Sequence, residues 1–414
     1  MQLRPSQQQA LDFALANSGG KTAIVAPTAA GKTIISKAIA GELVGRVAIL
    51  TYSNDLVHQF IKAFPEVPVI IASKHYPDKA MYMSHVTRAK TAKVVLFNAA
   101  SYVAYMQKPE AVPFDHVVLD EADSCLSLLQ LQTGHHYDWG GELTVSEAQV
   151  RQTACDNPHF LRNSQEYYWE VEETFDKKTQ SHRRTLILRS LKLQKSFLQR
   201  IFPQSIVAMS ATLFDSDLNE LFYGEKYEKL SLPSPIPVEN RRVTGFCDET
   251  YPETPEGLLS LLSAVLETHS ERPAIVHTTY AESKVLADLG QLYTYETKEG
   301  KMPALKALEG TTGVLLTPGA AVGLDLKYEK CRLNIILRGC FSNLGSDYVR
   351  RRKAIEPSWY TEFALKQLVQ ACGRSTRLPD DSSKIVVCDN RSIQLAASKA
   401  DSLPEYFRES CTFI

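Results

Sequence analysis

The segment APTAAGKT, at 26–33, most constrains what this chain can fold into. It follows a short apolar run at 23–25 and leads into a helical pattern beginning near Lys32, which is the strand, loop and helix context of a phosphate-binding loop. Gly31 would let the backbone approach a phosphate closely, Lys32 would reach the β and γ phosphates of a nucleotide, and the Thr33 hydroxyl would bind Mg²⁺. Ala26 stands where the generic pattern has its first glycine, so the segment needs support from other motifs. The predicted nucleotide-binding residues are Ala26, Pro27, Thr28, Ala29, Ala30, Gly31, Lys32 and Thr33.

A second motif, HVVLDEAD at 116–123, is an apolar strand that ends in adjacent carboxylates. Asp120 is placed to hold Mg²⁺ through water, and Glu121 to orient and deprotonate a water molecule that attacks a phosphate. The alternative is an ordinary acidic loop after a buried strand. A phosphate loop earlier in the same chain favours the catalytic interpretation.

A third motif, QACGRSTR at 370–377, supplies cations for the same chemistry. Arg374 and Arg377 are three residues apart, so on a helix they would project from one face and meet a γ-phosphate held by another domain. There they would stabilise the charge of the transition state as arginine fingers, and Gln370 would complete that wall. The alternative is a solvated basic end of a helix.

Composition agrees with a large enzyme of several domains. The chain has 414 residues, of which 44% are hydrophobic and 22% charged, and this length is typical of two or three domains. The formal net charge is −1, so an argument for nucleic-acid binding must rest on local patches and motifs. No apolar run approaches the roughly 18 residues of a membrane span, and the start MQLRPSQQQ does not look like a signal peptide. We expect a cytoplasmic protein that does not bind membranes.

The periodicity of apolar residues alternates between helix and strand along the chain, which predicts an α/β fold. Expected helices and strands alternate up to the acidic motif, after which residues 127–163 show no clear pattern. Tyr167–Thr174 and Thr185–Ser190 then form a predicted β-hairpin. The expected strands are 22–25, 46–51, 68–72, 93–97 and 116–119, then 273–277, 312–316, 332–337 and 384–388; the expected helices of the first half are 5–16, 32–43 and 54–63.

These patterns predict two parallel-sheet domains, each with a ligand crevice at the ends of its strands. The first domain would span residues 1–230 and contain an insertion at 127–190. A Pro-rich connection at 231–244 would link it to a second domain at 245–414. The two crevices would clamp one nucleotide between them.

The order of AxTxxGKT, DEAD, MSATL at 209–213, GLDL at 323–326 and QxxGRxxR resembles the superfamily 2 helicases. Further segments resemble the XPD/DinG branch, and the resemblance covers most of the chain, with the SATL form nearer to DinG. These segments are RPSQ at 4–7, LPSPIPVENRRV at 232–243, NIILRGCFSNLGSDYVRRRK from Asn334, and WYTEFALKQLVQACGRSTRLPDDSSKIVVCDNR at 359–391.

The resemblance implies two RecA-like motor domains and an ATP-dependent DNA helicase that translocates on single-stranded DNA in the 5′→3′ direction, in DNA repair or replication. ATP and Mg²⁺ would be its cofactors, single-stranded or tailed duplex DNA its partner with RNA as an open alternative, and the protein a monomer. By position in the matching motifs, Gln7 would read adenine, while Gly323 and Asp325 would lie near the nucleotide. Ser210 and Thr212 would couple hydrolysis to the grip on the strand.

Nucleic-acid contacts are expected from loops that present hydroxyls, amides and backbone N–H groups to phosphates, with aromatic rings available for stacking. The matching residues are Thr51, Ser53, Asn54, Phe97, Asn98, Tyr102, Thr278, Thr279, Tyr280 and Thr317. Basic clusters at 182–184 and 350–353 are interpreted mainly as solvated faces, with phosphate contact as the alternative. The aromatic residues of the hairpin, including Trp169, are either core or a stacking platform.

The cysteines mark a departure from the branch. The chain has eight of them, scattered and without a CxxC pair, which predicts reduced thiols. Most members of the branch carry a four-cysteine iron–sulfur domain between the phosphate loop and DEAD, but here no cysteine precedes Cys125. We therefore expect no iron–sulfur cluster in that position.

Two other functions remain open from the sequence. One is a nucleic-acid-stimulated ATPase that remodels or anneals DNA or RNA without processive unwinding, as the absent cluster domain and small insertion would allow. The other is a nucleotide-sensing scaffold, which would have no need of every catalytic part from Lys32 to Arg377.

Overall fold

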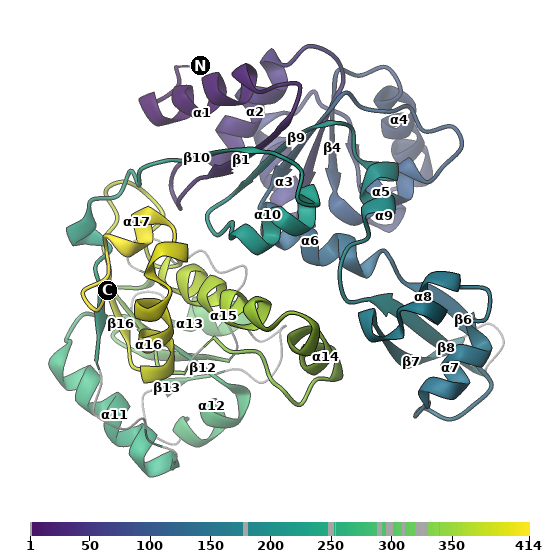
Figure 1. Ribbon diagram of the computed structural model, residues 1–414. Helices are drawn as coiled ribbons and strands as arrows, with labels where there is room; N and C mark the ends of the chain where they lie inside the picture. Colours follow the sequence, from purple (N-terminus) through teal and green to yellow (C-terminus); the bar gives the residue numbers. More distant parts are fainter. Residues whose placement is uncertain are drawn as a thin grey trace.

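The computed structural model describes residues 2–176, 181–246, 252, 254–287, 292–294, 301–308, 311–318, 326, 330–338 and 340–414. Two parallel β-sheets follow one another along the chain, each surrounded by helices, and a small third sheet stands to one side (Figure 1). This is the predicted α/β fold with two RecA-like domains.

The first parallel sheet has seven strands in the order β10-β1-β9-β5-β2-β4-β3. Its central strands are apolar throughout because helices cover both faces. Side chains alternate between the faces: Val25 and Leu50 enter one core, whereas Ile24 and Ile49 enter the other. The strands are β1 (Lys21–Val25), β2 (Val47–Thr51), β3 (Val69–Ile70), β4 (Val94–Asn98), β5 (His116–Asp120), β9 (Ser205–Ser210) and β10 (Glu228–Ser231). The helices are α1 (Pro5–Ala16), α2 (Lys32–Glu42), α3 (Asn54–Ala63), α4 (Lys79–Ala89), α5 (Ala99–Met106), α6 (Ala122–Leu131), α9 (Lys195–Ile201) and α10 (Asp215–Phe222), with a 3₁₀ turn, η1 (Ser73–His75).

Strand order in this sheet positions the site. β1, β9 and β5 are neighbours and run in the same direction, with Val25 opposite Ser210 and Asp120 opposite Met209. Because the carboxyl ends of parallel strands meet at one edge, the loops that follow these three strands lie together. They carry the phosphate loop, the segment SATL and the acidic motif DEAD.

The second parallel sheet has six strands in the order β11-β16-β15-β12-β14-β13. The four strands expected from the sequence are confirmed, and β11 and β13 extend the sheet at its two edges. The strands are β11 (Val243–Gly245), β12 (Ala274–Thr278), β13 (Leu292–Tyr293), β14 (Val314–Pro318), β15 (Leu333–Ile336) and β16 (Lys384–Val387). The helices are α11 (Pro255–Thr268), α12 (Tyr280–Leu286), α13 (Lys301–Leu308), α14 (Asp347–Ile355), α15 (Pro357–Cys372), α16 (Asn390–Ser398) and α17 (Glu405–Arg408), with the 3₁₀ turns η3 (Val238–Asn240) and η6 (Ala400–Ser402).

The insertion folds around an antiparallel sheet in the order β6-β8-β7. The predicted hairpin is confirmed, with Tyr167 paired to Ser190 at its base. The prediction that residues 127–163 lack regular structure is wrong, because short helices there depend on capping side chains: Asn157 Oδ1 accepts a hydrogen bond from Phe160 N at 3.0 Å. The elements are β6 (His135–Asp138), α7 (Glu147–Thr153), α8 (Pro158–Arg162), η2 (Ser164–Glu166), β7 (Tyr167–Asp176) and β8 (Ser181–Ser190).

A separate apolar cluster holds the insertion together. It contains Val150, Phe160, Tyr167 and Leu188, with Trp169 packed against it. Tyr167 is therefore a core residue of the insertion, as the default interpretation of the hairpin aromatics expected.

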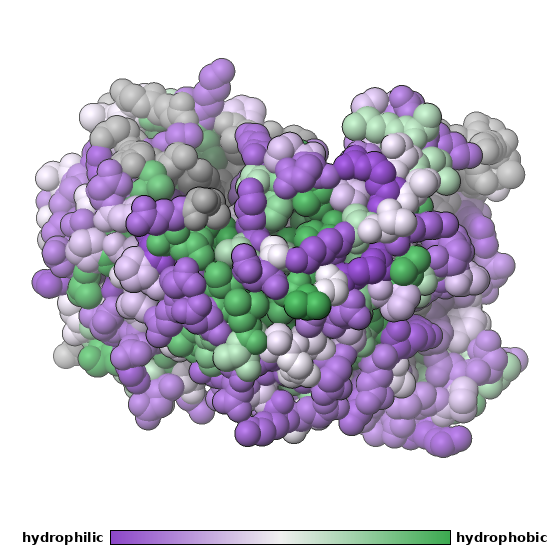
Figure 2. Space-filling view, turned by 90° about the horizontal axis from the view of Figure 1, so that it is seen from above, coloured by the Kyte–Doolittle hydropathy of each residue, from purple (hydrophilic) through white to green (hydrophobic). Residues whose placement is uncertain are grey.

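Polar side chains cover most of the face seen from above, and apolar residues gather toward its middle (Figure 2). In the described part of the chain, every helix is too short or too polar to cross a bilayer. The domain division predicted at 231–244 stays a prediction; β10 and β11, on either side of it, pair in different sheets.

Candidate active site

The phosphate loop joins β1 to α2 in a conformation that needs small residues. Gly31 caps α2 with a φ of 81°, and Ala29 also has a positive φ of 67°. A Cβ on Gly31 would lie 2.5 Å from Gln7 Nε2, so a side chain cannot be accommodated there without displacing Gln7. Ala26 N donates to Ser210 O at 2.9 Å, which ties the start of the loop to the end of β9.

Two side chains from the N-terminal segment brace this loop. Gln7 is buried, and its Nε2 donates to Ala30 O at 3.0 Å while its Oε1 accepts from Arg4 N at 3.0 Å. Arg4 Nη2 donates to Ala29 O at 2.8 Å and to Ala30 O at 2.7 Å. The adenine contact of Gln7 stays a prediction, and both ends of its amide are engaged here in holding the loop. Arg4 was not predicted as a site residue.

The acidic motif places two carboxylates beside Lys32. Glu121 caps α6 in a left-handed conformation with a φ of 53°, and Lys32 Nζ lies 3.3 Å from Glu121 Oε1. Burial would raise the pKa of the Glu121 carboxyl, but the charges of Lys32 and Arg374 outweigh it and hold that pKa below its usual value. Glu121 is therefore ionised at neutral pH and can accept a hydrogen bond from water.

Asp120, at the end of β5, has the environment of a cation ligand. It is buried, and its Oδ1 has no hydrogen-bond partner among the described residues. Burial, reinforced by the charge of Glu121, raises the pKa of Asp120 to about 7. A buried acceptor-only oxygen fits Mg²⁺, which prefers carboxylate and hydroxyl ligands. Asp120 and Thr33 are the residues that would hold it.

Hydroxyl groups after β9 connect the acidic motif to the other domain. Ser210 Oγ lies 2.7 Å from Asp123 Oδ1 and 3.1 Å from Glu121 Oε2, and a hydroxyl with one hydrogen donates to only one of them at a time. Thr212 Oγ1 donates to Asp123 Oδ2 at 2.5 Å. From α15, Gln370 Nε2 donates to Asp123 Oδ2 and to Thr212 Oγ1, both at 3.2 Å. The structure thus brings the predicted Ser210, Thr212 and Gln370 together around Asp123, a residue of the DEAD motif that had no predicted role.

The arginine motif approaches the phosphate loop from the second domain. A Cβ on Gly373 would lie 3.1 Å from Thr28 Oγ1, which shows how closely the end of α15 packs on the loop. The premise that Arg374 and Arg377 share a helical face is wrong, because α15 ends at Cys372 and both follow in a turn. Arg374 is nevertheless close enough to lower the pKa of Glu121.

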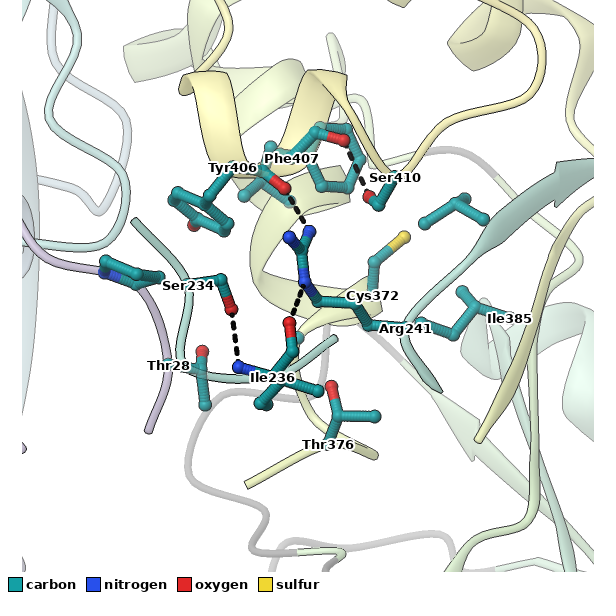
Figure 3. Close-up of a pocket in the computed structure, with 14 residues that line it drawn as sticks. Thr28, Ser234, Ile236, Arg241, Cys372, Thr376, Ile385, Tyr406, Phe407 and Ser410 are labelled. Atoms are coloured by element: carbon teal, nitrogen blue, oxygen red, sulfur yellow. Dashed lines mark hydrogen bonds between the residues drawn. The ribbon is translucent and has the colours of Figure 1, made fainter. Parts of the chain in front are cut away.

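A small cavity lies between the phosphate loop and the second domain (Figure 3). Its volume of about 30 Å³ is far below the roughly 300–1,000 Å³ of ligand pockets, so it has room for water only. Arg241 lies in it and donates to Ile236 O at 2.9 Å and to Tyr406 O (Figure 3). The Tyr406 hydroxyl in turn donates to Ala211 O at 3.0 Å, a contact between α17 and SATL that sequence patterns did not signal.

Several of the predicted nucleic-acid contacts are core residues. Phe97 and Tyr102 are fully buried with ring centroids 5.3 Å apart, and Tyr102 Oη donates to Ile201 O at 2.6 Å. Stacking of bases on these two rings is therefore wrong for this structure. The side chains of Thr51, Thr278 and Thr317 are also buried, which leaves their loops only backbone groups to offer.

Other predicted contacts keep accessible polar groups at the ends of strands. Asn98 Nδ2 donates to Asn54 Oδ1 at 2.6 Å, and both residues are partly exposed, as is Ser53. Thr279 is exposed and caps α12. The Tyr280 side chain, Gly323 and Asp325 lie outside the described residues.

The basic cluster at 350–353 forms a second contact between the domains. Arg352 on α14 is 2% exposed, donates to Leu191 O, and pairs with Glu220 on α10 at 2.7 Å. The Arg351 guanidinium lies 4.1 Å from the Trp169 ring centroid in the insertion. The interpretation of this cluster as a solvated helix face is therefore wrong for Arg351 and Arg352.

Comparisons with known proteins agree with this geometry. The chain matches the family model of the helicase C-terminal domain over residues 280–410 and that of the type III restriction enzyme, res subunit, over residues 1–124. No curated protein matches it. Three similar solved structures share the fold at low identity. They are "XPD_Helicase" (13% identity, TM-score 0.64, 96% of this chain and 98% of that one), "XPD_APO" (13%, 0.63, 97% and 99%) and S. tokodaii Xpd4 (14%, 0.62, 99% and 99%).

A phosphate loop, an acidic motif and an arginine motif that meet between two RecA-like domains, in a chain with both helicase-family matches, define an ATP-hydrolysing superfamily 2 helicase. Within that superfamily the chain is of the XPD/DinG-like type.

Proposed function

We propose that this chain is a DNA helicase that translocates on single-stranded DNA in the 5′→3′ direction and unwinds tailed duplexes as a monomer. The observation that supports it most is the contact of Gln370, from the second domain, with both Asp123 and Thr212 of the first. That contact joins the ATP centre to the segment that would transmit its state. The titles of the similar structures name XPD helicases, which supports the choice of substrate and direction.

The hydrolysis step follows from the Lys32–Glu121 ion pair at 3.3 Å. A bound γ-phosphate would compete for Lys32 and leave Glu121 free to accept a hydrogen bond from the attacking water. Arg374, which already acts on Glu121, would meet the charge that develops on the γ-phosphate. Mg²⁺, when bound, would neutralise phosphate charge, and Asp120 and Thr33 are the residues that fit it.

Coupling to the strand would run through the Ser210 hydroxyl. It lies within hydrogen-bond distance of both Glu121 and Asp123, so a change at Glu121 alters which carboxylate it serves. Asp123 is in contact with Gln370 of the second domain. Hydrolysis would therefore loosen or tighten the contact between the domains, which is the movement that advances a strand.

The strand would lie along the carboxyl ends of the strands of both sheets. In the first domain Ser53, Asn54 and Asn98 offer partly exposed polar groups there, and in the second Thr279 does so. Such groups, together with backbone N–H groups, contact phosphates without reading sequence. We propose this row as the strand-binding surface.

We further propose that the enzyme works without an iron–sulfur cluster, since no cysteine lies between the phosphate loop and DEAD. Purified protein should lack the brown absorbance, iron and sulfide of a cluster. About one cluster's worth of iron per chain in elemental analysis would overturn this proposal.

Two assays test the function in sequence. Stimulation of ATP hydrolysis by single-stranded DNA separates a motor from a nucleotide-sensing scaffold. Unwinding of duplexes with either a 5′ or a 3′ tail then separates a helicase from an ATPase that only remodels or anneals nucleic acid. Unwinding of 5′-tailed duplexes alone is the expected result; strand-stimulated hydrolysis without unwinding of any tailed duplex would favour the remodelling function.

A further inference from the structure

Lys366 reaches the first domain from the same face of α15 as Gln370, one helical turn away. Its Nζ lies 2.6 Å from Asp217 Oδ1 on α10, and the two side chains are only 12% and 11% exposed. The pair is therefore a buried ion pair that crosses the domain boundary. No motif assigns a role to either residue.

Asp217 connects this pair to the SATL segment. Its other oxygen, Oδ2, accepts a hydrogen bond from Phe214 N at 3.0 Å. Phe214 directly follows the SATL residues 209–213 and is itself buried. The position of Lys366 is thus tied to the backbone that leaves Thr212.

Lys366 also acts on Asp123. The hydrogen bonds that reach Asp123 come from neutral groups of Ser210, Thr212 and Gln370, and a buried carboxylate with only neutral donors is costly to ionise. Burial raises the pKa of the Asp123 carboxyl, and the charge of Lys366 opposes that rise. Burial would lower the pKa of Lys366, but Asp217 and Asp123 outweigh it, so the lysine stays charged.

We propose that Lys366 is a positioning residue for ATP hydrolysis: paired with Asp217 and facing Asp123 across the domain boundary, it arranges Ser210 and Thr212 beside Glu121 when the domains are closed. It touches neither nucleotide nor strand. The proposal concerns the ATPase step and does not depend on unwinding or on the direction of movement.

Steady-state hydrolysis in saturating single-stranded DNA tests it with Lys366→Met, Lys366→Arg and Asp217→Asn. Displacement of a catalytic group by about 1 Å costs on the order of 10²-fold in rate, so Lys366→Met should lower kcat by about that factor. The KM for ATP should stay close to that of the parent, because the phosphate loop is untouched. Lys366→Arg keeps the charge and should recover most of kcat. Lys399→Met, at an exposed lysine of the same domain, is the control that should match the parent.

The cycle of Lys366→Met with Asp217→Asn measures whether the two residues act together. Each single variant should lower kcat, and the double variant should be no worse than Lys366→Met, because contacting residues are not additive. Parent kcat in a folded Lys366→Met would overturn the proposal. So would a Lys366→Arg variant with parent Tm and a kcat as low as that of Lys366→Met. If Lys366→Met does not fold, Lys366→Arg decides alone: parent-like kcat supports the proposal, and a kcat lowered about 10²-fold at parent Tm overturns it.

Discussion

The two motor domains meet at the ATP centre and again at α14, and the two contacts are built from different groups. At the ATP centre, Gln370 and Lys366 reach carboxylates that also touch the hydrolysis machinery. At α14, Arg352 pairs with Glu220 at 2.7 Å, and Arg351 lies over Trp169 at 4.1 Å, away from any catalytic motif.

The difference concerns what nucleotide can change. A phosphate that enters the first contact competes directly for Lys32 and so alters Glu121 and its neighbours. The second contact has no such group: Tyr348 on α14 packs against Tyr168 with ring centroids 5.0 Å apart and donates to Gln130 Oε1 at 3.1 Å. We therefore expect the first contact to govern turnover and the second to govern how firmly the insertion and second domain stay attached.

The strongest way to break the first contact is to remove its chemistry. Glu121→Gln and Lys32→Ala should each nearly abolish hydrolysis, while Glu121→Gln should still bind ATP, because its phosphate loop is intact. Arg374→Ala should lose about 10³- to 10⁵-fold in kcat, the range for an arginine finger. Strand-stimulated ATPase assays and nucleotide binding measure these effects. Retention of turnover in all three variants would contradict the assignment of the site.

The second contact should break in stability before it breaks in rate. Arg352→Met leaves Glu220 and Glu356 buried without their shared cation and should cost about 3–5 kcal/mol in the free energy of unfolding. Arg350→Met, on the exposed side of the same helix, is the matched control and should stay within about 0.5 kcal/mol. Denaturant unfolding measures both. An Arg352→Met variant with parent stability but lost hydrolysis would reverse the comparison.

Only the first contact should respond to pH and Mg²⁺. Burial raises the pKa of Asp120 to about 7 from an ordinary 3.8, so between about pH 4 and 7 the native chain binds the proton more tightly than the unfolded chain. Its contribution to stability therefore falls as pH rises through that window. Asp120→Asn should remove this fall, and Mg²⁺ should raise Tm at pH 7 in the parent more than in Asp120→Asn. Equal Mg²⁺ effects in the two proteins, across thermal scans at several pH values, would argue against the metal site.

The smallest expected effect is the stacking of Arg351 on Trp169. A double-mutant cycle of Arg351→Met and Trp169→Leu should give a coupling of about 0.5–1 kcal/mol, as for a partly exposed cation–π pair. Basal ATP hydrolysis should be unchanged in both single variants, because neither residue contacts the ATP centre. A coupling near zero would show that the insertion rests on α14 without this contact.

Sequence patterns predicted most of the secondary structure around the site. The helix expected at 54–63 is α3 with the same bounds, because Ser53 caps it and accepts from Leu56 N at 3.3 Å. The apolar runs before the motifs are strands because both faces of a parallel sheet are covered. Short elements such as α7 and α8 were missed, since they rest on a few caps and on an apolar cluster shared with the hairpin.

The sequence by itself determined the order of the motifs and the side chains that carry the chemistry, among them Lys32, Asp120, Glu121 and Gln370, because their types and spacing fix what they can bind. Only the tertiary structure decided which groups became partners. It buried Phe97 and Tyr102, engaged Gln7 with the phosphate loop, and placed Arg352 and Lys366 in ion pairs between domains. Burial and pairing depend on residues that are distant in sequence, and no local pattern records them.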